Sequence, residues 1–255
     1  MTTKKSWTAD APLVIAHRGA SLLAPENTMA AFRLAAELGA DAIEFDVKLT
    51  RDGIAVIHHD MSLGRTTDGV GRIKDFNSTE LFRLDAGLKF GEKFRGEPIP
   101  TLEQVLIEFK DQILLNIELT NYTSPIDTLP QTVLSNLNYA NLTDNILISS
   151  FNLIALRKIN RLNPKIRTAL LVGTGIPGWV RRPLENLTPY DDLHPHYNLI
   201  TKKLVQRLHL SQNRINTWTV NDYDLMVELM SLGVDGIITD DVRSGIRARE
   251  ARLLP

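Results

Sequence analysis

The feature that most constrains the fold of this chain is the alternation of short apolar runs with helical segments along its whole length. Residues 13–16 form an apolar run that stops at a polar pair, and residues 28–38 then have helical spacing up to Gly39. Roughly eight such strand–helix units fit the sequence. Parallel strands need helical crossovers between them, so this repetition predicts a parallel sheet covered by helices.

The other elements are expected from the same patterns. Strands are predicted at residues 42–49, 54–58, 113–119, 146–149, 167–171, 199–200 or just before, 214–220 and 236–239. Helices are predicted at residues 101–110, 124–137, 152–160, 201–208 and 222–232.

Two folds accommodate this order, a closed TIM barrel and an open, doubly wound sheet. No Gly-x-Gly-x-x-Gly turn follows the first predicted strand, and this turn is the main sign of a dinucleotide-binding open sheet. We therefore predict a TIM (β/α)8 barrel as the single domain of residues 1–255, with the barrel itself at about 12–245. Residues 61–100 are too long for an ordinary connection, and we interpret them as a small insertion after the second strand.

Charge and composition exclude several classes of protein. The chain has 29 Lys and Arg against 30 Asp and Glu, a balance that argues against binding to nucleic acid. It has no cysteine, so any metal must be held by Asp, Glu, His or water. No signal sequence and no span-length apolar run is present, and we expect a cytoplasmic protein without a stable membrane anchor. The oligomeric state stays open.

Polar residues that interrupt the apolar strands indicate where chemistry is possible. Glu44 and Asp46 are two residues apart on a strand, so both point to the same face. Glu118 interrupts a third strand in the same way. Carboxylates that converge inside a barrel repel one another unless a cation lies between them, and their oxygens suit Mg²⁺, Ca²⁺ or Mn²⁺.

Two histidines and an arginine follow predicted strands close to these carboxylates. His17 and Arg18 end the first strand, and His59 follows the run at 54–58. Two imidazoles, an arginine and a hard cation are what hydrolysis of a phosphate ester requires. Taken singly, each of these residues also fits a structural role, as a hydrogen-bonded histidine, a carbonyl-capping arginine or a solvated strand edge.

The order and spacing of the motifs resemble those of the glycerophosphodiester phosphodiesterases over nearly the whole chain. The most specific segments are Ala-His-Arg-Gly at 16–19 and Ala-Pro-Glu-Asn-Thr at 24–28. The resemblance continues through segments 44–47, 52–53, 59–60, 65–69, 99–102, 116–118, 149–151, 218–221 and 233–240.

This resemblance implies a phosphodiesterase barrel that hydrolyses glycerophosphodiesters to glycerol 3-phosphate and an alcohol, with Ca²⁺ or Mg²⁺ as cofactor. The residues that match the family's metal ligands are Glu44, Asp46 and Glu118, and those that match its acid–base pair are His17 and His59. Among the substrate-binding positions, Arg18 matches the contact to the phosphate. Glu26 lies in the first active-site loop, where it would orient Arg18 or a histidine. Phe151 and Trp218 match positions on the apolar side of the substrate cleft.

One position departs from the family's pattern. A lysine is usual two residues after the third-strand glutamate, whereas this chain has Thr120. Lys48 lies on the same strand face as Asp46 and is a candidate substitute for that charge. Two other functions stay open, a lysophospholipase D-like phosphodiesterase and a catalytically silent barrel that binds a phosphorylated ligand. The sequence leaves open which cation binds, which alcohol is preferred and whether water or a substrate hydroxyl is the nucleophile.

Overall fold

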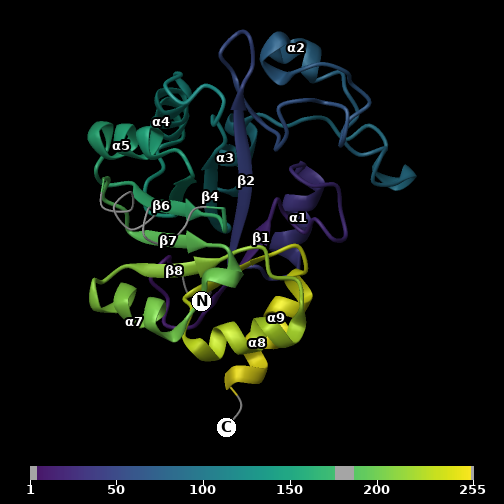
Figure 1. Ribbon diagram of the computed structural model, residues 1–255. Helices are drawn as coiled ribbons and strands as arrows, with labels where there is room; N and C mark the ends of the chain where they lie inside the picture. The colour runs from purple at the N-terminus through teal and green to yellow at the C-terminus, as the bar shows by residue number, and fades with distance from the viewer. Residues whose placement is uncertain (1–4, 176–186, 254–255) are drawn as a thin grey trace.

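Eight parallel strands close into a barrel in this protein (Figure 1), as the sequence predicts. The computed structural model describes residues 5–175 and 187–253. Closure is made by the first two strands, which pair in parallel with His17 opposite Glu44. The barrel strands are β1 (Leu13–His17), β2 (Ala42–Leu49), β4 (Leu114–Leu119), β5 (Ile146–Ser150), β6 (Arg167–Val172), β7 (Asp192–Pro195), β8 (Arg214–Thr217) and β9 (Gly236–Thr239).

Helices surround the barrel (Figure 1), and most begin at a side chain that accepts a hydrogen bond from the first turn. Thr28 accepts from the backbone N–H of Ala31, and Thr101 forms a capping box with Gln104. These helices are α1 (Met29–Glu37), α3 (Leu102–Phe109), α4 (Leu129–Ala140), α5 (Leu153–Leu162), α7 (Lys202–Leu210), α8 (Tyr223–Leu232) and α9 (Val242–Leu253).

The predicted elements differ from the structure most clearly at three places. Helix α4 begins at residue 129 rather than 124, because Pro130 fits the first turn of a helix and the residues before it form a loop. Helix α9 was not predicted at all. The seventh strand lies at 192–195, in the segment before 199–200 that the sequence offered as the alternative. Its inward residues, Asp192 and His194, are polar and hide the strand in a pattern based on apolar runs.

Strand β2 shows how alternation separates the core from the site. Ile43, Phe45 and Val47 are fully buried in the apolar layer between the strands and the helices. Glu44 and Asp46 point to the barrel interior instead. At the opposite, amino-terminal end the interior is filled by an apolar cluster that includes Trp7 from the segment before β1. The barrel interior is therefore apolar at one end and acidic at the other.

The predicted insertion after the second strand is confirmed. Strand β3 (Ala55–Ile57) pairs antiparallel with the end of β2, and the chain then forms η1 (Ile73–Asp75), α2 (Ser78–Leu81) and η2 (Glu92–Phe94). The insertion lies beyond the end of β2 (Figure 1) and has its own small apolar core, which consists of Val56, Leu63, Ile73, Leu81, Ala86 and Ile99.

None of the helices in the described parts of the chain has the length and apolar composition needed to cross a membrane.

Candidate active site

Three carboxylates converge at the carboxyl end of the barrel, where barrel enzymes carry their sites. Asp46 on β2 lies directly opposite Glu118 on β4, and Glu44 lies one inward position below Asp46. Each of the three offers an oxygen within 4.8 Å of the others. The side chains of Glu44 and Asp46 are almost completely buried. The predicted cluster is therefore present as one compact group.

Burial and mutual repulsion make this group unfavourable in its fully charged form. Burial, together with Asp46 and Glu118, raises the pKa of Glu44 well above its usual range. Burial and the charge of Asp46 raise the pKa of Glu118 to about 8, although the Tyr122 hydroxyl donates a hydrogen bond to Glu118. The Oε1 atom of Glu44 is buried without a hydrogen-bond partner in the described residues. An unpartnered carboxylate oxygen in a cluster of three fits a divalent cation with oxygen ligands.

His17 faces this cluster from the end of β1 and is held from behind by Asp240, just after β9. Its Nδ1 atom lies 2.6 Å from Oδ1 of Asp240. Asp240 also accepts hydrogen bonds from the Ser21 hydroxyl and the Asn221 amide. Burial alone would raise the pKa of Asp240, but the hydrogen bonds and the charge of His17 lower it to about 2. An ionised Asp240 fixes the proton on Nδ1 and turns Nε2 of His17 toward the site.

His59 is oriented in the same way by its neighbour in sequence. Its Nδ1 atom lies 2.7 Å from Oδ1 of Asp60, and Oδ2 of Asp60 accepts from Nε of Arg65 at 2.6 Å. Arg65 also donates to both oxygens of Glu26. A continuous chain of charged groups thus connects His59, through the insertion, to the first active-site loop.

Arg18 lies at the other end of this chain. Its guanidinium donates to Glu26 at 2.9 Å and lies 3.3 Å from Asp46, while its backbone N–H donates to Glu44. Glu26 therefore contacts Arg18 and not a histidine. The backbone of Arg18 is left-handed, with φ of 56°, a conformation that costs about 1–3 kcal/mol outside glycine.

The structure explains why the His-Arg-Gly motif has glycine at its third position, residue 19. Gly19 has φ of +85°, and a Cβ there would lie 2.7 Å from the backbone of Ala31 in α1. Only glycine fits this approach, and the contact fixes the turn that presents His17 and Arg18.

A cavity of about 110 Å³ brings the predicted residues together. Its lining includes His17, Arg18, Glu44, His59, Asn116, Glu118, Phe151 and Trp218. The rings of Phe151 and Trp218 meet edge to face at 5.5 Å and form an apolar wall. The structure therefore brings most of the predicted site residues to one cavity. Glu26 and Asp46 do not line it but contact Arg18 at the edge of the cavity.

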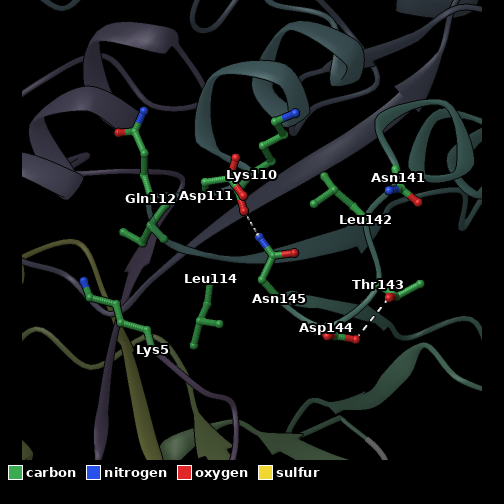
Figure 2. A pocket seen from close by; sticks show the side chains of 11 residues that line it. Lys5, Lys110, Asp111, Gln112, Leu114, Asn141, Leu142, Thr143, Asp144 and Asn145 are labelled. Carbon is green, nitrogen blue, oxygen red and sulfur yellow. Dashed lines mark hydrogen bonds between the residues drawn. The ribbon is translucent and has the colours of Figure 1, made fainter. Parts of the chain in front are cut away.

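A larger cavity, of about 660 Å³, lies at the opposite end of the barrel, among the loops that precede β4 and β5. Figure 2 shows its lining side chains, which include Lys110, Asp111 and Asn145. Active sites of such barrels lie at the carboxyl ends of the strands, so we assign the site to the smaller cavity.

Several residues of the site were not assigned a role from the sequence. Asp240, Asp60 and Arg65 lie in matched motifs, but only the folded chain shows that they bind the histidines and Glu26. Asn116 lines the cavity with both of its amide atoms buried and without a partner among the described residues. Two signals for Asn116 were available in the sequence: its place in the matched segment 116–118, and its position two residues before Glu118 on the same face of β4.

Lys48 and Thr120 meet at the rim of this site. The Lys48 ammonium donates to the Thr120 hydroxyl at 2.9 Å and to its carbonyl at 3.1 Å. The Thr120 hydroxyl in turn donates to the carbonyl of Val47. Lys48, which the sequence suggested as a substitute for the family's lysine, therefore contacts Thr120, the residue that stands in that lysine's position.

This contact predicts the effect of restoring the lysine. In Thr120→Lys, two ammonium groups would compete for one partly buried space, so we expect a lower melting temperature and no decrease in KM for the substrate. The exchange variant Lys48→Thr/Thr120→Lys keeps one cation and should recover most of the lost stability. Thermal melts and steady-state kinetics of both variants test this, and a lower KM in stable Thr120→Lys would contradict it.

A closed β/α barrel with these carboxylates, histidines and arginine at its carboxyl end defines a barrel enzyme suited to an anionic substrate. Residues 17–244 match the model of the glycerophosphoryl diester phosphodiesterase family. The chain belongs to this family.

Individual relatives agree with the family match. A glycerophosphodiester phosphodiesterase of Caldanaerobacter subterraneus is 43% identical over 233 residues, which cover 90% of this chain and 94% of the relative. A glycerophosphodiester phosphodiesterase of Bacillus altitudinis is 36% identical over 243 residues, which cover 93% of this chain and 98% of the relative. A solved phosphodiesterase of Oleispira antarctica, in complex with the product sn-glycerol-3-phosphate, has a TM-score of 0.87 and 35% identity, and the match covers 96% of this chain and 99% of that one.

Proposed function

We propose that this enzyme hydrolyses glycerophosphodiesters to glycerol 3-phosphate and an alcohol. The observation that carries the proposal is the single cavity lined by His17, His59, Arg18 and two of the three clustered carboxylates. The names of its relatives, and the product bound to the Oleispira antarctica enzyme, support this substrate class.

Glu44, Asp46 and Glu118 would hold a divalent cation, Mg²⁺ or Ca²⁺. Their oxygens converge within 4.8 Å, and one buried oxygen of Glu44 has no protein partner among the described residues. When bound, the cation supplies positive charge that neutralises phosphoryl oxygens. Arg18 would add a second, fixed positive charge, because Glu26 and Asp46 hold its guanidinium at the cavity.

His17 and His59 would transfer the protons of the reaction. Asp240 and Asp60 each accept a hydrogen bond from a histidine Nδ1, so the Nε2 atoms are the ones free to act in the cavity. One imidazole would take a proton from the nucleophile, water or a substrate hydroxyl, and the other would give a proton to the departing alcohol oxygen. The apolar wall of Phe151 and Trp218 would cover the organic part of the substrate and exclude water from that side.

The direct test is release of glycerol 3-phosphate from glycerophosphocholine, measured with and without a chelator. We expect release that stops when the cation is removed and returns when Mg²⁺ or Ca²⁺ is added. Release of choline from lysophosphatidylcholine, with an acylated phosphate as the other product, would instead indicate the lysophospholipase D-like activity. Binding of glycerol 3-phosphate without any turnover would indicate a silent barrel.

The Asp240–His17 pair gives a further prediction. Asp240→Asn removes one charge-assisted hydrogen bond, worth about 1.5–3 kcal/mol, so we expect kcat to fall by roughly 10–100-fold. Asn221→Ala, which removes a neutral donor to the same carboxylate, should have a smaller effect on kcat. Wild-type kcat in Asp240→Asn would remove Asp240 from the proton-transfer unit.

A further inference from the structure

A second cavity, of about 200 Å³, lies beside the site between the insertion and the loop that follows β4. We call it the basic pocket because three cations, Lys48, Arg72 and Lys74, line it. Its other lining residues include the polar Thr120, Asn121, Thr123 and Ser124 and the carboxylate of Asp127. The proposed mechanism uses none of these side chains.

Two of the three cations in the basic pocket have no charged partner in the part of the chain that the structure describes. Arg72 and Lys74 are exposed, and their side chains make no hydrogen bond or ion pair with any residue that the structure describes. The carboxylate of Asp127 is already engaged, because its Oδ1 accepts from the Asn121 amide and from the backbone N–H of Leu129. Two unpaired cations, with Lys48 beside them and one occupied carboxylate, favour an anionic ligand in this pocket.

Lys48 connects the basic pocket to the reaction centre. It lies two residues beyond Asp46 on the same face of β2, and its hydrogen-bond partner Thr120 lies two residues beyond Glu118 on β4. Since Asp46 and Glu118 are directly opposite each other, Lys48 and Thr120 form the next layer above the carboxylates. The basic pocket therefore begins where the carboxylate cluster ends.

The two sides of the barrel mouth differ in chemistry. Phe151 and Trp218, after β5 and β8, form the apolar wall, whereas the basic pocket lies beside β2 and the end of β4. A diester held at Arg18 and the carboxylates would direct one substituent toward each side. The substituent on the Lys48 side meets positive charge and hydroxyl donors rather than aromatic rings.

We propose that the basic pocket binds a second phosphate group carried by the alcohol part of the substrate. This rests on the proposed function, since it assumes that the diester is cleaved at the carboxylate cluster. The phosphate would accept charge-assisted hydrogen bonds from Arg72 and Lys74, and Lys48 would lie between the two phosphates and neutralise part of their mutual repulsion. The preferred substrates are then diesters whose alcohol is itself phosphorylated.

The test compares two substrates that differ by one phosphate. These are glycerophosphoglycerol and its derivative phosphorylated on the terminal hydroxyl of the alcohol. In the wild type we expect the phosphorylated diester to have a roughly tenfold lower KM, consistent with two solvent-screened cation contacts. In Arg72→Gln/Lys74→Gln the ratio of the two KM values should fall to about one.

A charge-matched control separates local contacts from net charge. Lys202→Gln/Lys203→Gln removes two exposed charges at the start of α7, which follows β7 on the far side of the barrel from the insertion (Figure 1). This variant should keep the wild-type KM ratio. Equal KM values in the wild type, or an unchanged ratio in Arg72→Gln/Lys74→Gln, would overturn the proposal.

Failure of the proposed function has a different signature. If the wild type hydrolyses neither diester, the proposed function fails, and calorimetric titration with glycerol 1,3-bisphosphate still tests the basic pocket. Tighter binding to the wild type than to Arg72→Gln/Lys74→Gln supports an anion site there, and equal binding rules it out.

Discussion

His17→Ala and His59→Ala are each expected to lower kcat by about 10²–10⁴-fold, the usual contribution of a positioned proton-transfer group. Each histidine lines the cavity and has its Nδ1 occupied by a carboxylate, which leaves Nε2 for the substrate. Because the two imidazoles act on the same reaction, the double variant should lose much less than the product of the single losses. Steady-state kinetics at saturating metal measure these values.

A surface histidine supplies the control for these variants. His209 on α7 is exposed and pairs with Asp235, which precedes β9 at the other end of the barrel. His209→Ala should therefore keep wild-type turnover. Wild-type kcat in either His17→Ala or His59→Ala would remove that histidine from the acid–base pair.

Glu44→Gln is expected to weaken binding of the divalent cation by about 100-fold or more and to lower activity in parallel, because one of three converging carboxylates is lost. The amide is isosteric and the site is fully formed by the barrel, so the variant should fold. Metal titration by calorimetry, followed by activity at each metal concentration, tests both effects. Glu228→Gln, an exposed site on α8, is the matched control, and an unchanged titration in Glu44→Gln would contradict its role as a ligand.

The same cluster predicts how the metal-free protein responds to pH. The pKa of Glu118 is raised from 4.5 to about 8, and that of Glu44 is raised as well. Between pH 4.5 and about 8, Glu118 is protonated in the folded state and ionised in the unfolded state, so the folded state binds more protons. The free energy of unfolding should therefore fall as pH rises from about 4.5 to 8. Melting temperatures in chelator should show this fall, Glu44→Gln should reduce it, and added cation should reverse it. A flat profile in chelator would indicate that the carboxylates do not repel one another.

The fold could be predicted from the sequence because each strand and helix of the repeat is specified by residues close together in the chain. Each apolar run, each cap such as Thr28 or Thr101 and each Gly turn acts over a few residues, and together they require a parallel sheet with helical crossovers. Strand β7 was the hardest to place because this local signal is absent there. The inward residues of β7 are Asp192 and His194, whose polar side chains are buried beside Arg167 and Asn216 and therefore do not form an apolar run.

The face of each site carboxylate was also determined by the sequence. A period of two places Glu44 and Asp46 on one side of β2 and Phe45 on the other, whatever the rest of the chain does. The motif resemblance added the histidines and Arg18. Apart from Glu26, which the resemblance placed beside Arg18 or a histidine, neither source contained the partners that hold these groups in place.

Those partners were decided by the tertiary structure alone. Asp240 lies 223 residues from His17 and reaches it only because β9 pairs with β1 when the barrel closes. Arg65 reaches Glu26 because the insertion folds back over the first loop, and Lys48 reaches Thr120 because β2 and β4 pair in a single register. The local sequence pattern determines which face of a strand a side chain occupies. Strand register and barrel closure determine which distant side chain it contacts, because register and closure depend on the packing of the whole barrel.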